Sequence, residues 1–232
     1  MDSPVSISIE TSCRCGGVAL GAGDELIECV GFEAARRHAV QLVAQLDELL
    51  ARHGLAATDL EEVYVSAGPG SFTGLRIGVT VAAILSQSIA EMGCVSVPTV
   101  EAVAENAAQA GIDGHIGVIM DAKDSIYAAI FTVCSGQIVP EGPPGTTSVQ
   151  QFLSDAPSPI TLLGEGLGYH RISGEGIIIA DDRLWFPTAE GVWRVGRRLS
   201  RKGQFVQANP IRPLYLRRPA AEFSAKASHF SR

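Results

Sequence analysis

Hydrophobic and polar positions alternate over the first thirty residues and then recur at the spacing of a helix. Short apolar stretches at residues 5–9, 16–20 and 26–30 are joined by glycine-containing turns, which predicts an antiparallel meander of three strands. Residues 33–53 follow with an amphipathic helical pattern, in which we assign Val43 to the apolar side together with the leucines. The chain is therefore predicted to begin with three strands and a helix.

A tight turn rich in small residues joins the next strand to the next helix. Residues 63–66 are apolar, and Gly68 and Gly70 lie in the turn that follows, where glycine permits backbone angles that other residues avoid. The helix predicted at residues 75–90 has no charged residue from position 77 onward, so nearly all of its surface must be covered. It is too short for a membrane span and has the length of a buried core helix.

Four small residues mark one side of this helix. They recur every fourth position and are Gly74, Gly78, Ala82 and Ser86. Residues at this spacing share one face of a helix, so the stripe permits the close approach of another element. That element is either a helix of a partner subunit or a part of the same chain, and the residues alone leave both interpretations open.

The remainder of the chain repeats the organisation of its beginning. A strand at residues 94–97 and a helix at residues 100–110, with Thr99 as its N-cap, complete the first unit. A second meander follows, and its first strand ends on Asp121 much as the first strand of the chain runs into Glu10. The elements predicted beyond residue 110 are strands at 115–121, 125–133, 136–139, 160–164 and 176–180 and helices at 148–153 and 188–201.

This order of elements predicts an α/β fold built from two related units. We place them at residues 1–110 and 111–232, and the pattern allows the last segment to pack back on the first unit. The composition agrees, because 46% of the 232 residues are hydrophobic and 6% are aromatic, as in ordinary α/β proteins.

Charge excludes one class of function and singles out one segment. The formal net charge of −7 argues against a protein that grips nucleic acid unaided, because neutralising phosphates needs clustered lysine and arginine. Residues 191–221 differ from the rest, since they carry basic side chains and no aspartate or glutamate. This segment is either a solvated helix face or a contact with an acidic partner or RNA.

Cysteine and histidine usage argues against several kinds of active site. The five cysteines form no C-x-x-C pair and the sequence shows no signal peptide, which together predict a reducing, cytoplasmic location and no membrane association. The five histidines are scattered, and no serine lies in a G-x-S-x-G elbow. A peptidase would therefore lack both a metal pair and a nucleophile.

One set of residues is compatible with nucleotide chemistry. Glu10 and Asp121 end the first strands of the two units, where two carboxylates could hold Mg²⁺ through waters and phosphates. The other residues of this candidate nucleotide site are Thr11, Ser12, Gly68 and Gly70. The turn at Gly68 matches neither the P-loop nor the Rossmann pattern. An independent ATPase or kinase is the alternative function that this set would support.

Several motifs together resemble the bacterial TsaB (YeaZ) family. They are Ile9-Glu-Thr-Ser12, His38 in the first helix, Gly68-Pro-Gly-Ser-Phe-Thr-Gly-Leu-Arg-Ile-Gly78, Pro98-Thr-Val-Glu-Ala102, Asp121-Ala-Lys123 and Pro213-Leu-Tyr-Leu-Arg217. The resemblance extends over nearly the whole chain, and the glycine-rich motif is its most specific part. The related catalytic protein TsaD has a different version of that turn and adds metal-binding histidines that this chain lacks.

The resemblance implies an actin/Hsp70-like (ASKHA, ribonuclease H-like) fold of two lobes, with mixed sheets flanked by helices. It also implies a non-catalytic role in making threonylcarbamoyladenosine in tRNA, as a scaffold subunit that forms a heterodimer with the TsaD transferase. A TsaE ATPase joins the larger complex, tRNA is contacted only indirectly, and the chain alone is expected to form a homodimer. No cofactor of its own is expected, apart from ATP or ADP with Mg²⁺ at a shared subunit interface.

We expect the partner interface to combine the outer face of the first helix with the small-residue stripe. Its candidate residues are Arg36, His38, Gln41, Gln45, Gly74, Gly78, Ala82 and Ser86. Two departures from the family weaken the case for nucleotide binding. Glu10 stands where the family usually has aspartate, and Asp124 and Ser125 follow Lys123 where a Gly-Glu pair is common.

Overall fold

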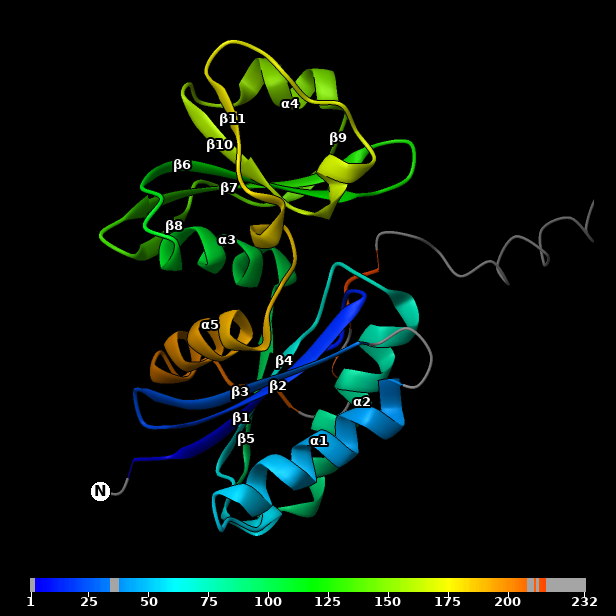
Figure 1. Ribbon diagram of the computed structural model, residues 1–232, viewed down its shortest axis with the longest axis vertical. Helices are drawn as coiled ribbons and strands as arrows, with labels where there is room; N and C mark the ends of the chain where they lie inside the picture. Colours follow the sequence, from blue (N-terminus) through cyan, green and yellow to red (C-terminus); the bar gives the residue numbers. More distant parts are fainter. Residues whose placement is uncertain (1–2, 34–37, 208–210, 212, 216–232) are drawn as a thin grey trace, which may run out of the picture.

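Two β-sheets lie one above the other, with helices between them and outside them (Figure 1). The structure is a computed structural model that describes residues 3–33, 38–207, 211 and 213–215, without the side chains of residues 33, 38 and 39. The first sheet has the strand order β3-β2-β1-β4-β5. Its strands are β1 (Val5–Glu10), β2 (Cys15–Ala22), β3 (Glu25–Glu33), β4 (Glu62–Ser66) and β5 (Gly93–Val97). The first three strands form the predicted antiparallel meander, and β4 and β5 run parallel to β1.

The second sheet has the same plan as the first. Its order is β11-β10-β6-β7-β8, and β9 also pairs with β7. The strands are β6 (Gly114–Asp121), β7 (Ile126–Cys134), β8 (Gln137–Pro140), β9 (Gly145–Thr147), β10 (Ile160–Leu163) and β11 (Ile177–Ile179). An antiparallel meander again has two parallel strands on the far side of its first strand. This repeat confirms the expected actin/Hsp70-like fold of two related α/β lobes.

The helices complete a layered arrangement. One outer layer contains α1 (His38–Arg52) and α2 (Phe72–Ser88), which cover the outer face of the first sheet (Figure 1). Between the sheets, α5 (Ala189–Arg201) packs on the first sheet and α3 (Thr99–Gln109) on the second, and the two helices contact each other. The outer face of the second sheet carries α4 (Val149–Asp155). No helix in the described part of the chain is both long and apolar enough to cross a bilayer.

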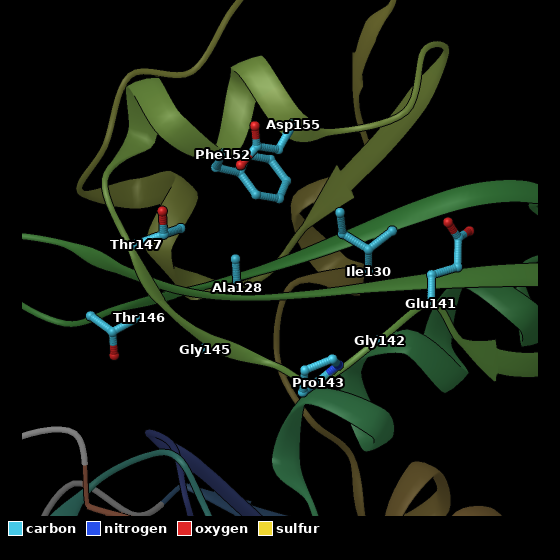
Figure 2. A pocket seen from close by; sticks show the side chains of 10 residues that line it. All are labelled: Ala128, Ile130, Glu141, Gly142, Pro143, Gly145, Thr146, Thr147, Phe152 and Asp155. Atoms are coloured by element: carbon cyan, nitrogen blue, oxygen red, sulfur yellow. The ribbon is translucent and has the colours of Figure 1, made fainter.

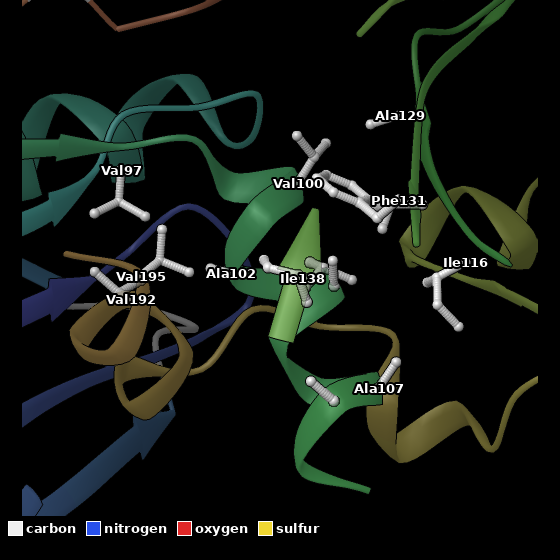
Figure 3. Packing of buried hydrophobic residues seen from close by; sticks show 14 of the residues in the cluster. Val97, Val100, Ala102, Ala107, Ile116, Ala129, Phe131, Ile138, Val192 and Val195 are labelled. Carbon is white, nitrogen blue, oxygen red and sulfur yellow. The ribbon is translucent and has the colours of Figure 1, made fainter. Parts of the chain in front are cut away.

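The two inner helices share one hydrophobic core. Figure 3 shows Val192 and Val195 of α5 facing Val97 of the first sheet, while Val100 of α3 lies beside Phe131 of the second. All five side chains are at most 2% exposed to solvent. Because one buried cluster contains side chains from both sheets, the lobes are joined by core packing as well as by the chain that connects them.

Helix α5 is anchored on β1 by hydrogen bonds as well as by apolar contacts. Trp193 is 2% exposed, and its indole Nε1 donates to the hydroxyl of Ser6 at 2.9 Å. The hydroxyl of Ser8 donates to the carbonyl oxygen of Ala189 at 2.6 Å. The serines that alternate along β1 therefore face the last helix and are buried by it.

The basic side of α5 is engaged within the chain. Arg198 contacts Glu105 at 3.2 Å and Glu101 at 3.8 Å, both on α3. Arg197 contacts Glu62 at 3.7 Å. These arginines thus pair with acidic residues of their own chain, which neither sequence interpretation of the basic segment had anticipated. Residues 208–210, 212 and 216–221 of that segment lie outside the described residues.

Three sequence predictions of local structure were wrong at the element boundaries. The first helix begins at His38, because Glu33 still belongs to β3 and residues 34–37 lie outside the described part. Thr99 is the first residue of α3, and Pro98 takes the N-cap position. The strand β9 was not among the predicted strands, since a three-residue strand that begins at Gly145 shows no alternation.

We expect Trp193→Ala to lower the free energy of unfolding by about 3–5 kcal/mol, because it leaves a cavity and removes a partner of Ser6. Urea denaturation followed by circular dichroism measures the change. Phe186→Ala is the control, since Phe186 is 36% exposed and its loss should cost less than about 1 kcal/mol. Equal, small losses for both variants would show that α5 adds little to stability.

Candidate functional site

The glycine-rich turn between β4 and α2 packs against the chain that follows β1. A Cβ atom at Gly74 would lie 1.9 Å from the carbonyl oxygen of Thr11, and one at Gly70 would lie 2.5 Å from that of Ser12. The amide of Ser71 donates to the same Ser12 oxygen at 2.7 Å. Glycine is therefore required here because backbone meets backbone, and any side chain would separate the two segments.

The start of α2 is tied to its own cap and to the chain after β1. Ser71 is the N-cap, and its hydroxyl accepts from the amide of Gly74 at 3.3 Å. The hydroxyl of Thr11 donates to the carbonyl oxygen of Gly74 at 2.8 Å. The turn therefore holds two parts of the chain together.

The C-terminal segment covers the other glycine of the motif. The amide of Leu214 donates to the carbonyl oxygen of Ala67 at 2.7 Å, and a Cβ at Gly68 would lie 2.4 Å from the carbonyl oxygen of Leu214. Nearby, the ring of Tyr215 contacts that of Phe72 with centroids 4.8 Å apart. Two motifs that lie far apart in the sequence are thus in contact, which sequence spacing could not predict.

Glu10 lies at the carboxyl end of β1 and is 1% exposed. Its Oε1 accepts hydrogen bonds from the amide and the hydroxyl of Ser12, the latter at 2.6 Å. Its Oε2 is buried, and so is the hydroxyl of Ser66, which interacts with the carboxylate. Burial raises the pKa of the Glu10 carboxyl, and the hydrogen bonds from Ser12 offset only part of that effect.

Asp121 occupies the equivalent position at the end of β6, with different surroundings. Its Oδ1 accepts from the amide of Lys123 at 3.0 Å and lies 3.1 Å from Nε2 of His170. The Asp121 side chain is 11% exposed. The fold therefore repeats in each lobe both the position of the carboxylate and its bond from the amide two residues further on. The other partner differs, since it is the Ser12 hydroxyl at Glu10 and His170 at Asp121.

The predicted nucleotide residues are closely packed in the described part of the chain. Glu10, Thr11 and Ser12 are buried, and a Cβ at Gly68 or Gly70 would meet backbone of the same chain. The close approach that glycine permits is used inside the molecule at these two positions, and nucleotide binding by this set stays a prediction. Among the described residues, no three His, Cys, Asp or Glu side chains are grouped to hold a metal ion.

Comparison with known proteins agrees with this architecture. The family model described as "TsaD: tRNA N6-adenosine threonylcarbamoyltransferase" matches residues 30–158, more than half of the chain. The Bacillus subtilis protein named tRNA threonylcarbamoyladenosine biosynthesis protein TsaB is 29% identical over 176 residues, which are 74% of this chain and 76% of the relative. The Escherichia coli protein of the same name is 25% identical over 232 residues, 93% of this chain and 95% of the relative.

Solved structures give the same result for the fold. The crystal structure titled "YeaZ from Pseudomonas aeruginosa" superposes with a TM-score of 0.79 at 21% identity, over 91% of this chain and 99% of that one. Another, described as an uncharacterized protein with similarity to peptidase YEAZ from Pseudomonas aeruginosa, has a TM-score of 0.82 at 21% identity, over 92% and 100%. The chain belongs to the family that the TsaD model describes, on its TsaB (YeaZ) branch.

In this TsaB-family chain the small-residue stripe faces inward. Gly74 lies against Thr11, and a Cβ at Gly78 would lie 2.3 Å from the Thr11 hydroxyl. Ala82 is fully buried in the core of the first sheet, and the hydroxyl of Ser86 donates to the carbonyl oxygen of Met92 at 3.0 Å. The prediction that this stripe docks a partner was therefore wrong, because it brings α2 close to its own sheet.

The outer surface of α1 and α2 presents a different set of residues. Val40, Val43 and Ile84 are 66%, 54% and 57% exposed, which is unusual for such side chains. Gln41 is exposed and Gln45 is partly exposed, as predicted for the outer side of α1. Arg36 and the side chain of His38 lie outside the described residues.

Sequence reasoning had placed Val43 on the buried side. Four leucines of α1 are buried, Leu42, Leu46, Leu49 and Leu50, whereas Val43 is 54% exposed. A helix turns about 100° per residue, so Val43 lies only about 20° from Leu50 and at the edge of the buried stripe. The spacing of the leucines alone therefore could not show that Val43 is exposed.

We expect Gly74→Ala to destabilise the protein by about 2 kcal/mol or more, because the new methyl group would meet the backbone of Thr11. This loss would outweigh the gain of about 1 kcal/mol that alanine has over glycine in a helix. Gly145→Ala is the matched control, since a Cβ there meets no described atom within 4 Å. If both variants unfold at the same urea concentration, the tight contact does not exist in solution.

Glu10→Gln tests the buried carboxyl. The unfolded chain titrates near pH 4.5, and the folded-state pKa is higher, so the stabilisation from this group is complete below pH 4.5 and is lost as the pH rises through the folded-state pKa. Glutamine cannot ionise, and its advantage over wild type should grow with pH, by up to about 1.4 kcal/mol per unit of raised pKa. Urea unfolding at a series of pH values, with the exposed Glu175→Gln as control, measures this difference. Parallel profiles for Glu10→Gln and wild type would rule out a raised pKa.

Proposed function

We propose that this chain is a non-catalytic subunit in the biosynthesis of threonylcarbamoyladenosine in tRNA, where it binds a TsaD-like transferase. Relatives named for that pathway over most of the chain support the pathway. The observation that carries the role is the apolar outer surface of α1 and α2, which we call the α1–α2 face. It consists of Val40, Gln41, Val43, Ala44 and Ile84.

The α1–α2 face has the properties of a protein interface. Val40, Val43 and Ile84 are exposed side chains of α1 and α2. These two helices are neighbours (Figure 1). Burying each of these side chains against a partner would contribute about 1.5–3 kcal/mol, whereas in the isolated chain they remain in contact with water. Exposed apolar groups gathered on one side of a protein are typical of binding surfaces.

The contacts that the motif residues make within the chain support a role without catalysis. The amides of Ser71 and Gly74 in the glycine-rich turn bond to Ser12 and Ser71, and the Glu10 side chain is buried. We infer that the transferase reaction takes place in the TsaD-like partner and that this chain positions or stabilises it.

The same face would pair two copies of the chain when no TsaD-like protein is present. The homodimer and the heterodimer would then exclude each other, because both need Val43 and Ile84. With a net charge of −7, this chain would leave most contacts with tRNA to its partners, including the TsaE-like ATPase of the larger complex.

We expect Val43→Arg to weaken binding to the TsaD-like protein at least about thirtyfold, because a charge would be buried at the centre of an apolar contact. Size-exclusion chromatography with light scattering on the mixed proteins measures complex formation. Val139→Arg is the matched control, since Val139 is 57% exposed but lies on β8 of the other lobe. A complex that survives Val43→Arg and is lost with Val139→Arg would move the interface to the second lobe.

A further inference from the structure

The outer face of the second sheet is covered less completely than that of the first. The first lobe places α1 and α2 there, with 15 and 17 residues. The second lobe has only α4, with 7 residues, and joins β10 to β11 through the short 3₁₀ helix η2 (Glu165–Gly168) and a loop. Side chains of β7 on this face are therefore left partly uncovered.

A pocket of about 270 Å³ opens where this cover is incomplete. Between β8 and β9 the chain stays on β7 at both ends, since the amide of Glu141 donates to the carbonyl oxygen of Ile130 at 2.9 Å and Gly145 pairs with Ala128. Residues 142–144 between them are extra to the ladder, and their two prolines have no amide to donate to the sheet. Figure 2 shows the space between this segment, β7 and α4. Its floor is apolar and consists of Ala128, Ile130 and Phe152.

Two carboxylates stand at the rim of the pocket, and no lysine, arginine or histidine lines it. Hydrogen bonds from Thr132 and His115 lower the pKa of Glu141, so this carboxylate is ionised at neutral pH. Asp155 accepts from Gln151 through Oδ2 at 2.8 Å. Its Oδ1 makes no hydrogen bond within the described part of the chain, so it can accept from an incoming donor.

We propose that this pocket binds an arginine side chain carried by an extended segment of another protein. The methylene groups of arginine would lie over Ala128 and Ile130, and the guanidinium would reach one carboxylate at the rim and lie in the field of the other. Charge-assisted hydrogen bonds to carboxylates suit a guanidinium, and the same two groups repel phosphates and acidic peptides. This site is separate from the α1–α2 face and does not depend on the proposed function.

The test uses the full chain and two short peptides, acetyl-Gly-Arg-Gly amide and the same peptide with citrulline in place of arginine. Citrulline has nearly the same shape but no charge. Titration followed by amide chemical shifts should give saturable changes at Thr146, Thr147 and Phe152, with affinity in the millimolar range expected for one side chain. The citrulline peptide should bind about threefold more weakly or not at all.

Variants test whether the difference in affinity between the two peptides depends on the two carboxylates. Asp155→Asn and Glu141→Gln should each reduce the difference between the two peptides, whereas the exposed Glu175→Gln, on the loop before β11, should preserve it. Equal affinities of the two peptides for the wild-type chain would overturn the proposal. So would saturable shifts confined to residues away from the pocket, or no saturable shift at all. The comparison of peptides on the wild-type chain keeps the test decisive even if a variant fails to fold.

Discussion

The packing of α5 on β1 is the contact on which both lobes depend. Ser6 and Ser8 point at this helix and are fully buried, and each forms a hydrogen bond with it. A buried hydroxyl without a partner costs about 1–3 kcal/mol, so the polar side of β1 requires these bonds. The other side of α5 meets α3, which supports the second sheet. The chain therefore has a common core only once its last helix is in place.

Most of the fold could be predicted because hydrophobic spacing and turn residues agree with each other. The two meanders and the parallel strands appear in the sequence as separate apolar stretches, and Gly54 and Ser71 mark the end of α1 and the start of α2. The repeat of the first unit in the second was also visible. β9 escaped prediction, since three residues carry too little periodicity to distinguish a strand from a loop.

The candidate site was harder to predict. The spacing of small residues along α2 indicates that another element packs closely against the helix, but it does not show which element this is. A helix that is apolar on nearly every side has no pattern to show which side meets its own sheet, and Gly78 proved to face Thr11. The charges of α5 posed the same problem. Arg198 bonds to Glu105, 93 residues away, and a run of basic residues contains no information about such distant partners.

The bond between Trp193 and Ser6 joins residues 187 positions apart. During synthesis the first strand leaves the ribosome long before α5 exists, so the inner face of the first sheet must wait for nearly the whole chain. Contacts of such high sequence separation also slow folding, because a large loop has to close before any of them forms. We therefore expect the nascent first lobe to be incompletely folded on the ribosome, and to depend on chaperones until α5 is released.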